Sequence, residues 1–152
     1  MLKKLIYYIL ILNFMVVSAQ LNQEPKSITK KFFSEFNNLE NITPALKKKK
    51  GFTNYKELLT YIDEKVQKYP ELVSSNFIGE SQKGKKIPIL YISKNSDYDI
   101  KKLRVWMQGG LHGNEPASTE SLLYLIHLIL EDPSYKYLLD KIDLAILPMA
   151  NI

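Results

Sequence analysis

The stretch LRVWMQGGLHGNEPASTESLLYLIHLILEDPSYKYLLDKIDLAIL, residues 103–147, decides the fold. Its apolar first run predicts a strand over 103–107, and its nearly all-apolar last run predicts another over 142–147. Between them, Leu, Ile and Ala positions cover much of the circumference of a helix expected over 116–130, which is typical of a helix buried against a sheet. A strand, a crossover helix and a second strand form a βαβ unit whose parallel strands are buried on both faces. The fold class is therefore α/β.

Upstream of this unit, residues 52–92 predict one helix and one hairpin. Thr53 or Asn54 can cap a helix whose apolar positions recur at helical spacing as far as Tyr69, and Pro70 ends it. Two apolar runs, 73–79 and 87–92, flank a polar connection in which Gly84 suits a positive φ. The polar residues 93–102 are expected to form a loop, and a short helix is expected over 135–139.

The amino terminus has the pattern of a secretory signal peptide. Met1-Leu2-Lys3-Lys4 precedes an apolar run over 5–17, and Ser18 and Ala19 supply a small-residue cleavage site. The run is too short to cross a bilayer, which takes roughly 18 to 20 apolar residues. We therefore expect cleavage near Ala19, no stable membrane span afterwards, and a secreted or periplasmic protein.

Composition restricts the classes of partner. The formal charge is +5, and most of the excess comes from Lys3, Lys4 and the run Lys47-Lys48-Lys49-Lys50. No basic face interleaved with aromatic residues accompanies that run, so a nucleic acid is not an expected partner. The chain has no cysteine, so disulfides cannot stabilise an exported form. Residues 20–50 are polar and contain Pro25 and Pro44, which predicts a flexible leader with one short helix around 28–36.

The turn Gly109-Gly110-Leu111-His112-Gly113-Asn114-Glu115-Pro116 carries the chemistry. It places His112 and Glu115 three residues apart at the carboxyl end of a parallel strand, where open α/β sheets bind their ligands. Imidazole nitrogen and carboxylate oxygen are the ligands of a catalytic zinc, which needs a third protein ligand and an open position for water. No convincing third ligand occurs in these residues.

A purely structural interpretation of the same turn also exists. The glycines permit tight backbone geometry, Asn114 would cap the helix, and Glu115 and Pro116 suit its first turn. His127 lies in the middle of the helix, about 15 to 18 Å from its start at 1.5 Å per residue, so it is expected in the core or at its boundary and not in the site. Glu120 and Glu131 are expected to face solvent.

The order of several segments resembles the zinc carboxypeptidases of metallopeptidase family M14. The resemblance covers residues 52–152 and rests on the pieces YPELV at 69–73, IGESQKGKKI at 78–87, GGLHGNEP at 109–116 and LPMAN at 147–151. It implies a partial three-layer α/β/α sandwich with a mixed sheet. It also implies that His112 and Glu115 are two of three zinc ligands, in a two-histidine, one-glutamate set like that of carboxypeptidase A.

The family's remaining site residues follow the segment at which this sequence stops. These are the third ligand, a later histidine, together with the arginine that holds the substrate carboxylate, an Asn-Arg pair, a tyrosine and the general-base glutamate. The resemblance thus implies an amino-terminal fragment: a signal peptide at 1–19, a leader at 20–50, and the first part of a catalytic domain at 51–152. Ending after residue 147 should leave the strand at 142–147 as an exposed apolar edge.

The function that the resemblance implies is hydrolysis of the C-terminal peptide bond of peptide or protein substrates by zinc-activated water. The 152-residue chain alone is expected to be inactive. Two alternatives remain open. One is a related amidohydrolase or deacylase acting on N-acyl amino acids or cell-wall peptides, and the other is an inactive binding module of the same fold. Residues downstream distinguish an enzyme from a binding module, because the enzyme needs a later histidine ligand and a glutamate base.

Overall fold

The computed structural model describes residues 25–32, 42–94 and 102–152, and the chain divides into two compact units, Met1–Asn38 and Leu39–Ile152. In the first unit the described residues form α2, Lys26–Phe32. The predicted signal peptide at 1–19 lies outside the described residues, as do residues 20–24 and 33–41 of the predicted leader. None of the helices in the described ranges has the length and apolar character needed to cross a membrane.

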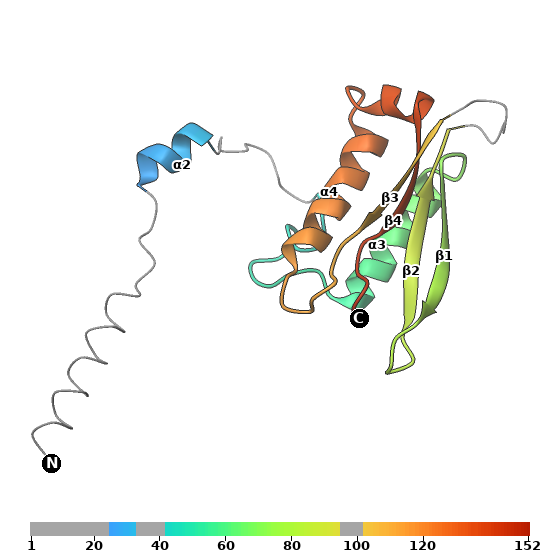
Figure 1. Ribbon diagram of the computed structural model, residues 1–152, viewed down its shortest axis with the longest axis horizontal. Helices are drawn as coiled ribbons and strands as arrows, with labels where there is room; N and C mark the ends of the chain where they lie inside the picture. The colour runs from blue at the N-terminus through green and yellow to red at the C-terminus, as the bar shows by residue number, and fades with distance from the viewer. Residues whose placement is uncertain (1–24, 33–41, 95–101) are drawn as a thin grey trace, which may run out of the picture. The chain divides into compact units, whose positions relative to one another are not determined.

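The second unit contains one mixed sheet of four strands with helices packed against it (Figure 1). The strand order is β1-β2-β4-β3. The elements are α3 (Tyr55–Lys68), β1 (Val73–Glu80), β2 (Lys86–Ile92), β3 (Leu103–Gln108), α4 (Ala117–Glu131), the 3-10 helix η1 (Lys136–Asp140) and β4 (Ile142–Leu147). The predicted α/β class and the mixed sheet are confirmed.

Helix α3 begins where its capping residues predict. The Asn54 side chain accepts a hydrogen bond from the Glu57 backbone N–H, and the Glu57 carboxylate accepts one from the Asn54 N–H, which completes a capping box. The helix ends at Lys68, two residues before Pro70, because proline lacks the N–H that a continuing helix requires.

The strand pairings follow from the connections between them. β1 and β2 pair antiparallel across the short turn in which Gly84 has φ +73°. β3 and β4 pair parallel through the crossover helix α4, with Val105 opposite Leu144 and Met107 opposite Ile146. β2 and β4 pair antiparallel, so the hairpin and the βαβ unit form one sheet.

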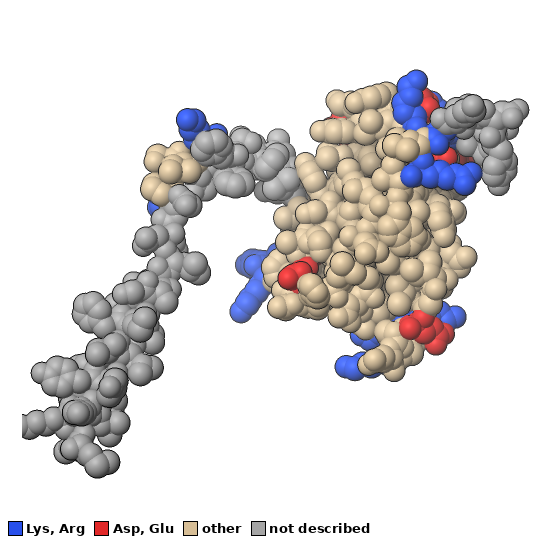
Figure 2. All heavy atoms as spheres, in the orientation of Figure 1, with Lys and Arg blue, Asp and Glu red and all other residues tan. Residues whose placement is uncertain are grey.

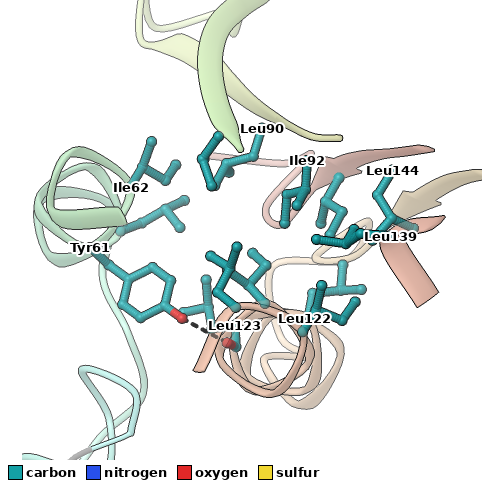
Figure 3. Close-up of a cluster of buried hydrophobic side chains, with 14 residues drawn as sticks. Tyr61, Ile62, Leu90, Ile92, Leu122, Leu123, Leu139 and Leu144 are labelled. Atoms are coloured by element: carbon teal, nitrogen blue, oxygen red, sulfur yellow. Dashed lines mark hydrogen bonds between the residues drawn. The ribbon is translucent and has the colours of Figure 1, made fainter. Parts of the chain in front are cut away.

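The core lies between one face of the sheet and the two helices α3 and α4 (Figure 3). Leu90 and Ile92 of β2 and Leu144 of β4 point toward Leu123 of α4, and these four side chains are buried. Tyr61 of α3 reaches the same cluster, where its hydroxyl donates a hydrogen bond of 2.8 Å to the Leu123 carbonyl. In the described residues, α3 and α4 thus form one helical layer on one face of the sheet.

The opposite face of the sheet and its β3 edge differ from the expectation of strands buried on both faces. Trp106 of β3 and Tyr91 of β2 flank Ala145 on that face, and both are exposed, Trp106 by 53%. In Figure 2 the broad middle of the visible face carries few charged side chains, which gather at its margins. The edge strands of the described sheet are β1 and β3, and β4 lies between β2 and β3. The expectation that residues 142–147 form the edge was therefore wrong, because β2 pairs with β4.

Residues 42–50, at the end of the predicted leader, belong to the second unit and contact other parts of it. Thr43 is buried and its hydroxyl donates a hydrogen bond of 3.3 Å to the Glu120 carboxylate. Lys48, from the four-lysine run, donates to the Phe52 carbonyl and to both oxygens of the Glu57 carboxylate. Lys48 therefore forms specific contacts, although the sequence predicted a flexible leader over 20–50. The domain boundary at residue 50 stays a prediction.

Candidate metal centre

The turn that carries His112 and Glu115, residues 109–116, connects the carboxyl end of β3 to α4. We call it the metal turn. Hydrogen bonds of the parallel type continue past the ends of the strands. The Gly109 N–H donates to the Leu147 carbonyl, and the N–H groups of Ala150 and Asn151 donate to the carbonyls of Gly109 and Gly110, all at 2.9 Å. Residues 148–151 are thereby held beside the start of the turn.

Two glycines are required by the close packing at this point. A Cβ on Gly109 would lie 3.0 Å from the Ser118 backbone. A Cβ on Gly110 would lie 2.9 Å from the Thr119 hydroxyl and 3.0 Å from the Met149 Cα, and Gly110 also has φ +60°. Gly113 has open space around it, so it is not required in the same way. The first two glycines let the turn approach α4 and residue 149.

The start of α4 differs from the predicted cap. The N-cap residue is Pro116, no side chain donates or accepts a capping hydrogen bond there, and Asn114 is exposed outside the helix. The turn is closed instead by the Glu115 N–H, which donates to the His112 carbonyl at 3.0 Å. Ser118 of the first helical turn accepts a hydrogen bond of 2.9 Å from the Gly110 N–H. Asn114 is thus not needed as a cap, and this removes part of the purely structural interpretation.

The two candidate ligands lie together. His112 Nδ1 is 2.9 Å from Glu115 Oε2. Both side chains are largely exposed, by 70% and 64%, and neither is committed to another side chain among the described residues. His112 Nδ1 and Glu115 Oε2 therefore contact each other directly, a proximity that sequence spacing alone only suggested.

This geometry fits two ligands of one zinc ion. Atoms that are each roughly 2.0 to 2.2 Å from the same metal can be at most about 4.4 Å apart, and the observed 2.9 Å is within that limit. His112 Nδ1 and one oxygen of Glu115 would hold the ion once Nδ1 is unprotonated. Within the described residues no group of three or more His, Cys, Asp or Glu side chains is placed to hold a metal. Among the described residues, the candidate metal centre therefore consists of His112 and Glu115 alone.

A cavity of about 320 Å³ adjoins the pair. Its lining combines the metal turn, the residues before and at the start of α3, the hairpin turn and the end of the chain: residues 52–55, Lys85, Gly110, His112, Gly113, Glu115, Pro116, Thr119, Met149, Asn151 and Ile152. From the sequence, residues 52–55 were predicted to begin a helix and Lys85 to lie in a hairpin turn. No motif indicated that these segments meet the metal turn, because their approach depends on tertiary packing.

Glu120 and Glu131 were expected to face solvent, but both are partly buried and bind other residues. Glu120 accepts hydrogen bonds from the Thr53 N–H at 2.7 Å, from the Thr53 hydroxyl at 3.0 Å and from the Thr43 hydroxyl at 3.3 Å. Thr43 and Thr53 are both buried. Glu120 therefore ties the segment before α3, one wall of the cavity, to the helix that follows the metal turn.

Glu131 lies at the other end of α4 and is bound by two lysines, Lys65 and Lys68. Burial alone would raise the pKa of Glu131, but the hydrogen bonds and positive charges of these lysines lower it to about 2. His127 Nδ1 is 3.9 Å from the same carboxylate, and burial together with the charge of Lys65 lowers the pKa of His127. His127 is partly buried in this network, far along α4 from the metal turn, as the sequence predicted.

Comparison with known proteins identifies the family. A family model described as zinc carboxypeptidase matches residues 58–152. The chain belongs to the zinc carboxypeptidase family. The resemblance to this family, inferred from the ordered segments in residues 52–152, is confirmed, and the chain is a member of a family of metallocarboxypeptidase hydrolases.

Relatives in this family are carboxypeptidases by name. Carboxypeptidase 2 of Trichophyton rubrum is 40% identical over 77 residues, which are 47% of this chain and 14% of the relative. Carboxypeptidase B of Helicoverpa zea is 30% identical over 120 residues, 77% of this chain and 28% of the relative. The crystal structure of carboxypeptidase A from Helicoverpa armigera matches with a TM-score of 0.62 and 34% identity, over 66% of this chain and 24% of that one. The chain thus spans less than a third of the length of these relatives.

Proposed function

We propose that this chain is part of an exported zinc metallocarboxypeptidase that hydrolyses the C-terminal peptide bond of peptide or protein substrates. The observation that carries the proposal is the 2.9 Å approach of His112 Nδ1 to Glu115 Oε2 beside a cavity, at the carboxyl end of a parallel strand. The family assignment and the carboxypeptidase names of the relatives favour this reaction over an amidohydrolase or deacylase reaction.

In this proposal His112 and Glu115 are two protein ligands of the zinc ion. When bound, zinc polarises the scissile carbonyl and lowers the pKa of its water from ~15.7 toward ~7. The turn positions one imidazole nitrogen and one carboxylate oxygen before zinc binds. The hydrogen bond from the Gly110 N–H to the Ser118 hydroxyl fixes the backbone on either side of these two residues. A third ligand, a general base and a group that binds the substrate carboxylate are required in addition. We propose that they are contributed by residues other than those described.

The organisation along the chain is part of the same proposal. Residues 1–19 act as a signal peptide, 20–50 as a leader, and 51–152 as the amino-terminal part of the catalytic domain, so that the enzyme acts in a periplasm or outside the cell. The start of the family match at residue 58 supports a catalytic domain that begins near residue 51.

The test is a peptidase assay on the protein produced from the gene that encodes this sequence. Release of the C-terminal amino acid from a short peptide should stop when zinc is chelated and return when zinc is added. His112→Ala should abolish the release, whereas His127→Ala should retain it because His127 lies in the Glu131 network. Turnover that survives both chelation and His112→Ala would overturn the proposal.

The 152-residue chain by itself should release no amino acid, because its described residues supply two candidate ligands, which would hold zinc weakly, and no assigned general base. Measurable turnover by this purified chain would contradict that part of the account. Zinc binding without turnover by the protein produced from the gene would favour the inactive binding module.

A further inference from the structure

Lys85 contributes one positive charge to the lining of the cavity that adjoins His112 and Glu115. Of the residues that line the cavity, only Lys85 and Glu115 are charged. Glu115 is the residue that the proposed function assigns to zinc, so its negative charge is already matched. The charge of Lys85 has no such partner in the cavity.

Lys85 is held in this position by the start of α3. Its Nζ lies 5.3 Å from the centre of the Tyr55 ring, within the range of a cation–π contact. The Tyr55 hydroxyl donates a hydrogen bond of 2.8 Å to the Lys86 carbonyl, which ties the hairpin turn to the helix. Lys85 forms no ion pair with any described residue. Its ammonium group is therefore placed at the cavity and available to a ligand.

The neighbouring lysine, Lys86, differs from Lys85 in its position relative to the cavity. Lys86 Nζ lies 5.7 Å from the centre of the Phe77 ring on β1, and Lys86 does not line the cavity. The two lysines are adjacent in sequence and carry the same charge. They therefore separate an effect of position in the cavity from an effect of net charge.

We propose that Lys85 is a specificity-determining residue that binds an acidic side chain of a peptide substrate in the cavity beside His112 and Glu115. This inference rests on the proposed function, because it takes the cavity as the place where the peptide lies. The volume of about 320 Å³ is at the lower end of the range of ligand pockets, roughly 300 to 1,000 Å³, which suits a few residues of a peptide. The amide and hydroxyl groups of Asn54 and Thr53 on the same wall are uncharged and do not oppose a carboxylate.

The experiment measures binding of matched peptides to the zinc-loaded chain by NMR titration. The probes are Ala-Glu-Phe and Ala-Gln-Phe, each prepared with a free and with an amidated C-terminus. The Glu peptide should bind about two- to fivefold more tightly than the Gln peptide, the effect of an exposed ion pair. The ratio should be the same for both C-termini, which distinguishes the acidic side chain from the terminal carboxylate.

The variants identify the lysine responsible. Lys85→Ala should reduce the Glu-to-Gln ratio to about one, Lys85→Arg should keep it, and Lys86→Ala should leave it unchanged. A ratio that Lys85→Ala does not alter, an equal loss in Lys86→Ala, discrimination that disappears with the amidated peptides, or no binding of any of the peptides would each overturn the proposal.

Failure of this inference is distinguishable from failure of the proposed function. A zinc titration on the same samples reports on His112 and Glu115 independently of Lys85. If zinc binds through that pair but the peptides are not distinguished, only the assignment to Lys85 falls. If the pair does not bind zinc, the proposed function falls.

Discussion

Gly110 combines two constraints that a side chain would violate. Its φ of +60° is costly for other residues, and an added Cβ would lie 2.9 Å from the Thr119 hydroxyl and 3.0 Å from the Met149 Cα. The turn can therefore approach both α4 and residue 149 only with glycine at this position. The proximity of Asn151 to the candidate metal pair depends on that approach.

Gly110→Ala should destabilise the fold by about 1–3 kcal/mol, because the alanine must adopt a strained conformation or push neighbouring backbone away. Urea unfolding measures the change. Gly113→Ala is the matched control, since a Cβ there meets nothing within 4 Å, and it should alter stability by no more than about 0.5 kcal/mol. Equal effects of the two substitutions would contradict this account of the turn.

Residue spacing in this chain predicts nearby partners better than distant ones. The spacing of His112 and Glu115 predicted that the two side chains lie close enough to share a cation. The structure places His112 Nδ1 2.9 Å from Glu115 Oε2, and the cation itself stays a prediction. The same reasoning assigned Glu120 and Glu131 to solvent, because glutamates on a helix are usually exposed. It could not foresee that Thr53 and Lys65, more than 60 residues earlier, would approach them.

At the scale of elements, helix starts show where local rules suffice. Thr53 or Asn54 was predicted to cap α3, and Asn54 does so in a capping box in which the Asn54 side chain, the Glu57 carboxylate and the backbone groups all lie within four residues. The predicted Asn114 cap of α4 was wrong, because the hydrogen bonds of the metal turn place Pro116 at that position. Local capping signals thus fail where a tertiary arrangement controls the backbone.

Asn54→Ala should lower stability by about 1 kcal/mol, since the first turn of α3 loses its acceptor for the Glu57 N–H. Asn114→Ala, which removes the same atoms from a position without a capping role, should cost less than about 0.5 kcal/mol. Thermal or urea unfolding of both variants compares them. A larger loss for Asn114→Ala would indicate that α4 depends on this side chain after all.

Strands are predicted well in position and less well in environment. The bounds of β4, Ile142–Leu147, agree with the predicted strand, and β1 and β2 pair as the hairpin pattern indicated. The apolar run of β3 predicted burial on both faces, yet Leu103 and Trp106 are exposed. Apolar periodicity identifies a strand, but its place in the sheet depends on pairings such as that of β2 with β4.

At the scale of the whole molecule, α3 and α4 are joined by charge as well as by the core. Lys65 of α3 is buried, and it shares the Glu131 carboxylate of α4 with Lys68. Removal of one partner from such a network leaves the others without compensation. The network therefore contributes to the packing of the two helices only while Glu131 is ionised.

The lowered pKa of Glu131 predicts a loss of stability in acid. The ordinary pKa of 4.5 applies to the unfolded chain and a pKa of about 2 to the folded one, so the unfolded state binds more protons between these values. The stabilising contribution of ionised Glu131 is present above pH 4.5 and is lost as the pH falls toward 2. Glu131→Gln should weaken the dependence of unfolding free energy on pH in this window. An unchanged pH profile in Glu131→Gln would contradict the charge network.

The central claim is that His112 and Glu115 bind one zinc ion together, and calorimetric titration of zinc into the chain tests it most directly. We expect one ion per chain, with affinity at least about tenfold lower in both His112→Ala and Glu115→Ala and unchanged in His127→Ala. Binding that survives loss of His112 or Glu115, or that depends equally on His127, would contradict the claim.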